Sequence, residues 1–216
     1  MINLAIVCSG PTIEPIDPVR FISNRSSGRS GLQLVKEAVA RGIPQIIFIT
    51  GPTCLDVGNP AYSVLPVETA LQMRENLLAY SDNADVIIMA AAVSDYRVVD
   101  YSEEKIKKDQ ETLTLQLVKN PDILFELGQR KKPGQLLVGY AAETHDIFEN
   151  ARKKFKRKNL DLLVLNQIST GNPAFYVDKN QVYFLTDDGV FRKLEMMTKS
   201  SLAALVWDEI FKLQGK

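Results

Sequence analysis

The sequence has no excess of charge of either sign, because 26 lysines and arginines are balanced by 26 aspartates and glutamates. A strongly basic chain would suggest nucleic acid or a membrane surface as a partner, and this balance supports neither. The sequence also lacks an apolar run of about eighteen residues, the length that spans a bilayer as a helix. Any site for an anion must therefore come from a local grouping of positive charge.

Histidine, tryptophan and cysteine are scarce, with one, one and two residues in a chain of 216. Cys8 and Cys54 lie in or near apolar runs at a spacing that matches no metal motif. We therefore expect two buried free thiols of a cytoplasmic protein, and no metal site. The lone histidine, His145, is more typical of an incidental residue than of a catalytic one. The apolar N-terminus lacks a basic leader and a small-residue cleavage pattern, which favours a first strand over a signal peptide.

What the sequence does contain is an alternation of strand and helix patterns, in a composition that is 45% apolar. Strands are expected at 3–10, 44–51, 62–67, 84–93, 112–118, 135–143 and 160–167, helices at 31–42, 68–81, 120–130, 146–159 and 199–213, and a hairpin at 181–195. Strands that alternate with helices predict an α/β fold with a parallel sheet and right-handed crossovers. No repeat or linker divides the chain, so residues 1–216 are expected to form a single domain.

Short signals refine several of these elements. Pro66 predicts that its strand lies at an edge or ends there. Asn120 is a plausible cap with Pro121 in the first turn of the following helix. Gly42 predicts the end of a helix, and Asp188–Gly189 predicts a hairpin turn.

The unusual polar stretches all follow strands. They occupy residues 9–28, 91–97, 141–144 and 166–175. Open parallel sheets bind ligands at the carboxyl ends of their strands, so these stretches are expected to meet at one site.

The stretch 14–31, EPIDPVRFISNRSSGRSG, precedes the helix expected at 31–42. Helix N-termini carry unpaired N–H groups and a partial positive charge, and small residues let an anion approach them. Arg20, Arg25 and Arg29 add positive charge nearby. A solvated loop together with a helix cap would explain the same composition. The residues alone therefore leave open whether this stretch binds an anion or only forms a loop and a cap. Neither the G-x-G-x-x-G fingerprint nor a Walker A lysine is present.

An ordered set of motifs goes further. The segments are SGPTIEPIDPVRFISNRSSG (9–28), AAAVSDYR (90–97), EEKIKK (103–108), KNPDIL (119–124), GYAAET (139–144) and ARKKFKRKNLDLLVLN (151–166). Together they resemble the phosphopantothenate–cysteine ligase family from about residue 3 to residue 212. The flavin-dependent decarboxylase domain often fused ahead of this domain in bacteria is not present, so the chain resembles the free-standing form.

The resemblance implies a Rossmann-like three-layer fold with a mainly parallel sheet, plus a β extension that forms a homodimer. It also implies a reaction that joins the carboxylate of 4′-phosphopantothenate to the amine of cysteine. A nucleoside triphosphate activates the acid as an acyl-nucleotide with release of pyrophosphate, and the amine then displaces the nucleoside monophosphate. The segments at 119–123 and 151–164 look bacterial, so CTP is expected rather than ATP, with Mg²⁺ accompanying the nucleotide.

Site residues follow from the same resemblance. Asn24 and Lys105 would be catalytic, the first as a donor to the reacting carbonyl and the second on a mobile segment. Substrate-binding residues would be Arg20, Asn24, Ser26, Ser27, Gly28 and Ala92. Nucleotide-binding residues would be Ala90, Ala91, Asp95, Pro121, Asp122, Ile123, Leu124, Tyr140, Lys154 and Lys158.

The chain departs from the family pattern at a few of these positions. Ser94 stands where the family usually has alanine, and Tyr140 stands where it commonly has phenylalanine. Arg29 and Ser30 replace lysine and methionine, so local packing or subunit contact there is expected to differ.

Two other classes of function stay open. An NAD(P)-dependent reductase on a Rossmann-like fold would use the Y-x-x-x-K pattern of Tyr101 and Lys105, although this pattern lies in a charged, loop-like segment. A non-catalytic nucleotide-binding module would bind the nucleotide without releasing pyrophosphate. For the ligase we expect small-molecule substrates, a homodimer and a cytoplasmic location, without nucleic acid or membrane partners.

Overall fold

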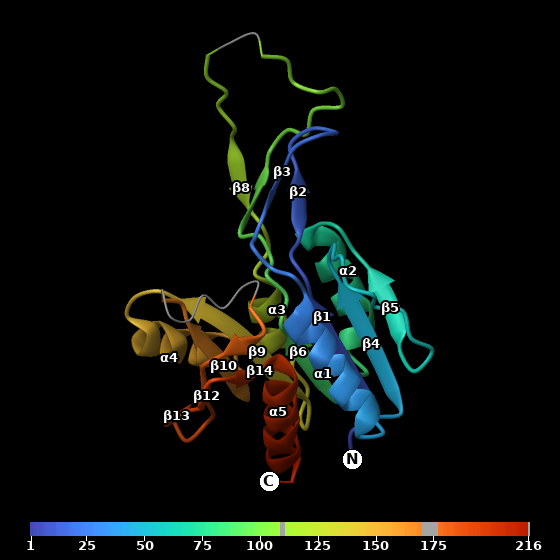
Figure 1. Ribbon diagram of the computed structural model, residues 1–216, viewed down its shortest axis with the longest axis vertical. Coiled ribbons are helices and arrows are strands. Elements are labelled where there is room, and N and C mark those ends of the chain that lie inside the picture. Colours follow the sequence, from blue (N-terminus) through green and yellow to red (C-terminus); the bar gives the residue numbers. More distant parts are fainter. Residues whose placement is uncertain (109–110, 170–176, 216) are drawn as a thin grey trace.

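The computed structural model describes residues 1–108, 111–169 and 177–215, and three layers build its main body (Figure 1). The helices are α1 (Arg29–Ala40), α2 (Ala70–Ser81), α3 (Ile123–Arg130), α4 (Ile147–Arg157) and α5 (Lys199–Gln214). The main sheet contains β1 (Leu4–Ser9), β4 (Gln45–Thr50), β5 (Ser63–Pro66), β6 (Val86–Met89), β9 (Leu136–Glu143), β10 (Leu162–Gln167), β12 (Val182–Leu185) and β13 (Phe191–Lys193). Four further strands, β2 (Ile13–Pro15), β3 (Phe21–Ser23), β7 (Tyr96–Val98) and β8 (Leu117–Lys119), form an extension, and β11 (Lys179–Asn180) pairs with β14 (Met197–Thr198).

The eight strands of the main sheet lie in the order β13-β12-β10-β9-β6-β1-β4-β5. The run from β10 to β5 is parallel throughout. If these six parallel strands are numbered 1 to 6 along the chain, their order in the sheet from β5 to β10 is 3-2-1-4-5-6. This is the strand order of the Rossmann fold. The predicted α/β fold with a mainly parallel sheet is therefore confirmed.

Apolar residues cover both faces of this sheet. One core cluster contains residues of α1 and α5, including Trp207, which is fully buried and donates from its indole nitrogen to the Leu34 carbonyl at 2.9 Å. The other cluster contains residues of α2, α3 and α4, including Met73 and Leu124. The continuous apolar run of β6 is buried at every position, as expected for a central strand covered on both faces.

Several local predictions are confirmed. Pro66 ends the edge strand β5, and Gly42, at φ +74°, follows the end of α1. The hairpin of β12 and β13 turns at Gly189, which also has a positive φ.

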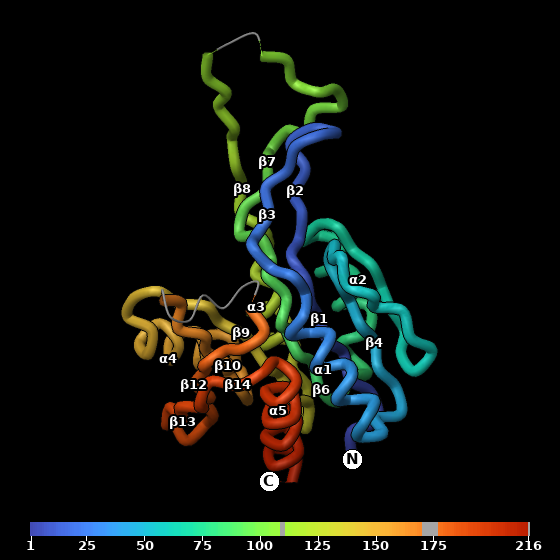
Figure 2. Tube along the Cα trace, viewed as in Figure 1, coloured from blue at the N-terminus to red at the C-terminus, as the bar shows by residue number. Residues whose placement is uncertain are grey.

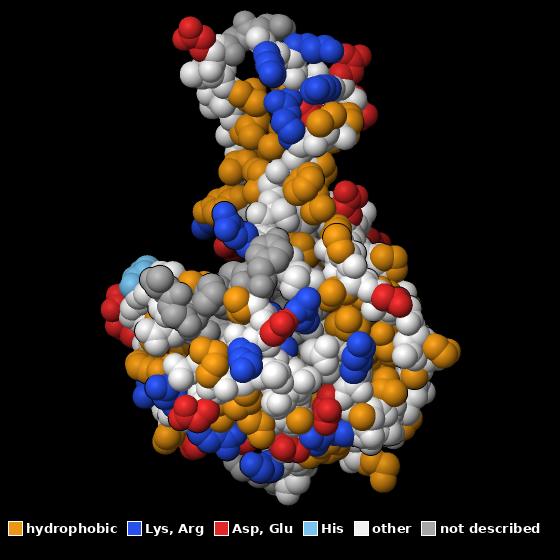
Figure 3. Space-filling model, viewed as in Figure 1, with side chains coloured by type: hydrophobic (Ala, Val, Ile, Leu, Met, Phe, Trp, Pro, Cys, Tyr) orange, Lys and Arg blue, Asp and Glu red, His pale blue; other side chains and the backbone are white. Residues whose placement is uncertain are grey.

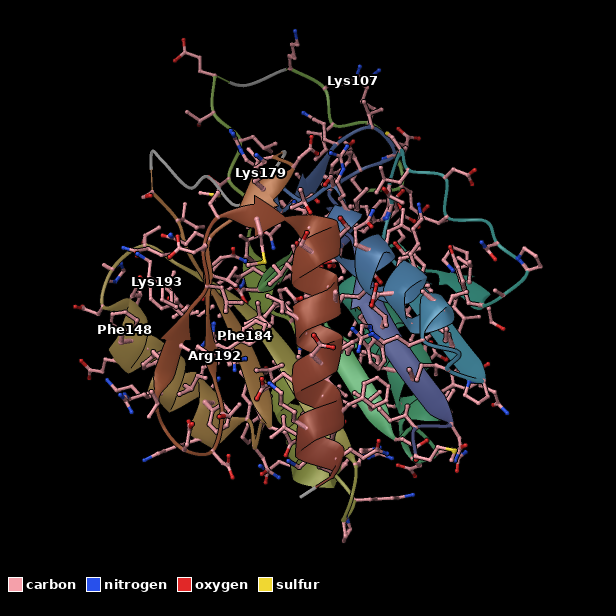
Figure 4. All side chains as sticks on the ribbon, turned by 60° about the horizontal axis from the view of Figure 1, so that its bottom comes forward. Lys107, Phe148, Lys179, Phe184, Arg192 and Lys193 are labelled. Carbon is pink, nitrogen blue, oxygen red and sulfur yellow. The ribbon has the colours of Figure 1, made fainter. Side chains whose placement is uncertain are left out.

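On β13, the Arg192 guanidinium lies 5.3 Å from the Phe184 ring centre and pairs with Glu209 of α5 (Figure 4). Charged side chains on a free edge strand discourage pairing with another chain.

Other predictions are wrong. Helix α3 begins later than expected, since Asp122 caps it by accepting from the Phe125 amide at 3.2 Å, and Asn120 lies before the helix. Cys8 is buried, but Cys54 is exposed in the loop after β4. The strand expected at 112–118 is reduced to β8, which starts at Leu117. The stretch that resembled a long polar loop contains the hairpin of β2 and β3.

The extension projects beyond the carboxyl ends of the parallel strands (Figures 1 and 2). It consists of two antiparallel hairpins, β2–β3 and β7–β8, with β2 packed against β7. Many of its apolar side chains are exposed, and they gather on its narrow neck (Figure 3). The exposed large apolar residues of the extension as a whole include Val19, Phe21, Tyr96, Tyr101, Leu113, Leu117 and Val118. Of the predicted polar segment 166–175, residues 170–175 lie outside the described residues.

Candidate active site

A cavity of about 1020 Å³ opens at the carboxyl ends of β6, β9 and β10, between the start of α1 and the end of α4. Its wall contains most of the residues that the sequence singles out: Asn24, Ser26, Ser27, Gly28, Ala90, Ala91, Ala92, Asp95, Pro121, Asp122, Ile123, Leu124, Tyr140, Lys154 and Lys158. Arg20 and Lys105 are not part of this wall. The polar stretches that follow β1, β6 and β9 therefore meet in one place, as expected for a parallel sheet.

Helix α1 begins directly at the cavity because its first turn packs closely on β1. Gly28 precedes the helix at φ +74°, a conformation that suits glycine, and offers no side-chain cap. A Cβ on Gly31 would lie 2.2 Å from the Cβ and Oγ of Ser9, so only glycine permits this approach. The buried Ser9 hydroxyl donates to the Gly28 carbonyl at 2.8 Å. The uncapped N–H groups of the first turn consequently face the cavity, where they suit an anion.

Asn24 lies just before this turn and uses its amide to hold a neighbouring segment. Its Nδ2 atom donates to the carbonyls of Val93, at 2.9 Å, and Ala92, at 3.2 Å. Both hydrogens of the amide therefore have acceptors in this structure. For the amide to donate to a reacting carbonyl, one of these two bonds must be exchanged for it.

The segment after β6 is fixed by its backbone. Ala92 donates to the Gly10 carbonyl at 2.8 Å, and Thr12 accepts from the Ser94 amide at 2.9 Å. The Asn120 side chain donates to the Ser94 carbonyl at 2.9 Å. The Ser94 hydroxyl oxygen is buried and has no hydrogen-bond partner in the described part of the chain. The exposed Asp95 side chain follows on this rigid segment and lines the cavity.

The basic wall of the cavity comes from the end of α4. Asp122 accepts from Arg157 and from Lys158, both at 2.7 Å, in addition to capping α3. Lys154 pairs with Glu143 at 2.9 Å. Each of these cations therefore has a carboxylate partner, which an incoming phosphate group would have to replace.

Tyr140 on β9 lines the floor of the cavity. Burial raises the pKa of its phenol well above the ordinary value, so this side chain stays neutral across the physiological range. A neutral ring with a hydroxyl can pack against a ligand and form one hydrogen bond, but it is not suited to act as a base at neutral pH.

Arg20 lies on the extension, where it forms an ion pair with the buried Asp17. Asp17 also accepts from the Ile106 amide at 3.2 Å, and Arg20 donates to the Ile106 carbonyl at 3.0 Å. The hydrogen bond from Arg20, together with backbone donors, holds the pKa of Asp17 well below its usual range. This pair holds the backbone at Ile106, between Lys105 and Lys107, the second of which is labelled in Figure 4. Neither Arg20 nor Lys105 lines the cavity of its own chain.

Several residues of the cavity wall escaped the sequence predictions. These are Arg157, Lys119, Asn180 and Lys199, whereas Asn166 belongs to the predicted polar stretch 166–175. Arg157 could have been found, because it neighbours Lys158 on the predicted basic helix. Lys199 begins α5, and no motif in the sequence connects that helix start with the cavity.

Six parallel strands in Rossmann order, with a large polar cavity at their carboxyl ends, define an α/β protein of the Rossmann-like class. Residues 3–213 match the family model described as the DNA/pantothenate metabolism flavoprotein C-terminal domain. The chain belongs to this family.

Relatives and a solved structure agree with this membership. The chain is 42% identical over 205 residues to the coenzyme A biosynthesis bifunctional protein CoaBC of Bacillus subtilis, covering 95% of this chain and 50% of that protein. It is 40% identical over 205 residues to a cysteine/cysteine sulfinic acid decarboxylase of an unknown prokaryotic organism, covering 95% and 57%. The chain thus spans about half the length of these curated relatives.

The crystal structure of the C-terminal domain of CoaBC has a TM-score of 0.82 and 32% sequence identity to this chain. The match covers 99% of this chain and 97% of that one. The described helices include none that is both long and apolar enough to cross a membrane.

Proposed function

We propose that this chain is a phosphopantothenate–cysteine ligase that works through an acyl-nucleotide. The observation that carries the proposal is the gathering of Asn24, Asp95 and Lys158, from three separate segments, around one cavity. Its volume of about 1020 Å³ lies at the upper end of the range for small-molecule sites, which suits two substrates side by side. Membership of the same family as the C-terminal half of CoaBC supports this assignment.

The reaction has two steps. In the first, a carboxylate oxygen of 4′-phosphopantothenate attacks the α-phosphorus of the nucleotide, and pyrophosphate leaves with the electron pair of the broken P–O bond. In the second, the amine of cysteine attacks the acyl carbon, the nucleoside monophosphate leaves, and the amine loses a proton. The basic residues at the end of α4 would bind the triphosphate, and small Ala90 and Ala91 would allow the nucleotide to lie against the backbone.

CTP as the nucleotide and Mg²⁺ as its companion belong to this proposal. Among the described residues, no group of three or more His, Cys, Asp or Glu side chains could hold a metal by itself. Mg²⁺ usually binds through one or two carboxylates together with substrate phosphates. Asp95 fits this need, because it is exposed at the cavity and forms no ion pair within the described residues, whereas Asp122 is occupied by two cations. When bound, the ion would neutralise phosphate charge.

The reductase alternative is weakened by the position of its proposed pair. Tyr101 and Lys105 lie in an irregular segment of the extension, and neither lines the cavity. The decarboxylase name belongs to a relative of which this chain matches 57%, so it gives no separate support for that activity here. A cytoplasmic location is part of the ligase proposal, and the free-standing form stays a prediction.

Pyrophosphate release tests the function directly. With CTP and phosphopantothenate we expect one equivalent of pyrophosphate per enzyme site without cysteine, and continuous release once cysteine is added. ATP should support a slower reaction, and CTP without phosphopantothenate should give none. Binding of CTP without any pyrophosphate release would instead indicate a non-catalytic nucleotide-binding module.

We further propose a homodimer in which the extension of one copy serves the cavity of the other. Its exposed apolar residues, such as Val19 and Phe21 at 56% and 55% exposure, would be buried in the contact. Arg20 and Lys105 would then complete the neighbouring cavity, since they do not line their own. The predicted catalytic role of Lys105 depends on this arrangement.

Mixing two inactive variants tests the shared site. Asn24→Ala and Lys105→Ala are each expected to be nearly inactive as pure dimers. After the two are mixed and allowed to exchange subunits, about a quarter of the wild-type activity should return, because half of the dimers are mixed and each has one intact site. An inactive mixture would place Asn24 and Lys105 in the same chain's site, and light scattering that finds a monomer at micromolar concentration would contradict the dimer.

A further inference from the structure

Lys199 is an unusual lysine, because it is buried at the cavity without a partner of opposite charge. It is the first residue of α5 and only 6% exposed, yet it contributes to the cavity wall. No carboxylate of the described residues forms an ion pair with it. By contrast, the three cations at the end of α4 all have carboxylate partners. A buried ammonium without a partner is costly for folding, so its presence at a cavity points to a missing anion.

The surroundings of Lys199 contain a further positive charge and, within the described residues, no carboxylate that pairs with Lys199. Burial is the main cause that lowers the pKa of Lys199, and the nearby Arg29 guanidinium lowers it further. Arg29 forms an ion pair with Asp178, whose side chain is 74% exposed and therefore well solvated. The strand pairing of Asn180 with Met197 brings Asn180 close to the start of α5, and its amide donates to Asn166 at 2.9 Å. Two cations and two amides thus share this part of the wall.

The start of α1 supplies donors to the same region. Gly28 gives α1 no side-chain cap, and Arg29, Ser30 and Gly31 line the cavity. The N–H groups of a first helical turn have no acceptor within the helix. An anion next to Lys199 would satisfy these donors and compensate the buried charge at once.

We propose that Lys199, together with Arg29 and the first turn of α1, binds a phosphoryl group of a substrate. This inference rests on the proposed ligase function, in which both the nucleotide and 4′-phosphopantothenate carry phosphoryl groups. Helices α1 and α5 cover the face of the sheet opposite to α4 (Figure 1). The cavity therefore has two basic walls from opposite faces, which suits two phosphorylated substrates that meet between them.

The variant Lys199→Met tests the proposal, because methionine retains an unbranched apolar side chain and removes the charge. Calorimetric titration with Mg·CTP and, separately, with 4′-phosphopantothenate should show a dissociation constant that is about 10- to 100-fold higher for one of them, as expected for a lost hydrogen bond to a charged group. The melting temperature should stay the same or rise, since an unpaired buried charge has been removed. Lys212→Met is the matched control on α5, and its exposed side chain predicts no change in binding.

The two titrations distinguish the source of the phosphoryl group. Weaker binding of CTP alone assigns Lys199 to the nucleotide, and weaker binding of phosphopantothenate alone assigns it to the acid. Arg29 is exposed, so Arg29→Gln should fold, and it should weaken the binding of the same substrate. This variant provides the test if Lys199→Met fails to fold. Unchanged binding of both substrates by folded Lys199→Met, or by Arg29→Gln where the former does not fold, would overturn the inference. Wild-type protein that binds neither substrate would overturn the ligase function as well.

Discussion

Replacing Asn24 with alanine should leave acyl-nucleotide formation active and slow the transfer to cysteine by about 100- to 1,000-fold, the usual effect of losing one donor to a developing oxyanion. Its amide bonds to Ala92 and Val93 place the nitrogen at the cavity wall, from which one hydrogen can be redirected. Single-turnover experiments that follow pyrophosphate and product separately would measure the two steps.

The same contacts provide an alternative that this experiment can detect. If Asn24 only holds the segment after β6, Asn24→Ala should damage both steps equally, which would contradict the catalytic role. Asn24→Asp should abolish both steps, because its oxygens would face two carbonyl oxygens and repel them. Ser23→Ala is a suitable control, since it removes a neighbouring bond to the Thr12 carbonyl outside the cavity wall.

Gly31→Ala should lower the free energy of unfolding by about 1–3 kcal/mol, the usual range for overpacking a core. The added Cβ would lie 2.2 Å from Ser9, which is fully buried on β1, so α1 must move outward. The first turn of α1 would move with it, and we expect a clear loss of ligase activity. Urea denaturation and steady-state assays would measure the two effects.

A second substitution tests this cause. Ser9→Gly removes the atoms that the new methyl group meets, so the double variant should recover stability relative to Gly31→Ala alone, although the bond to Gly28 is lost. Strictly additive effects of the two changes would contradict direct contact. Gly58→Ala is the control, because its added methyl group would make only an ordinary contact at 3.6 Å with Asp56.

Much of the fold could be predicted because the main strands are buried on both faces. The apolar runs of β1, β4, β6 and β10 are unbroken, and amphipathic or basic helices separate them. The resemblance implied the β extension, but the residues themselves indicated only one of its strands, at 112–118, for the opposite reason. Its strands β2, β3 and β7 are short and partly exposed, so they show neither an apolar run nor a clear alternation.

The residues of the site also divide into those that could be predicted from the sequence and those that could not. Residues that follow strands could be grouped, because the carboxyl ends of parallel strands meet at one edge. Lys199 could not be assigned to the site in this way, because it does not follow a strand. It reaches the cavity through the packing of α5 on α1, which depends on contacts such as that of Trp207 with Leu34. The cap of α3 was misplaced because Asn120 and Asp122 are equally good caps, and the side chain of Asn120 is instead bonded to the Ser94 backbone.

The packing of α5 against α1 also bears on the order of events during synthesis. Helix α1 is made early, but the apolar face that it shares with Trp207 stays uncovered until the ribosome has released the residues of α5. During synthesis the chain can thus assemble its parallel strands and the α2–α4 layer first, while the layer of α1 is completed only when α5 has been made. Because Lys199 arrives with α5, the cavity acquires its buried ammonium only after the other residues of its described wall have been synthesised.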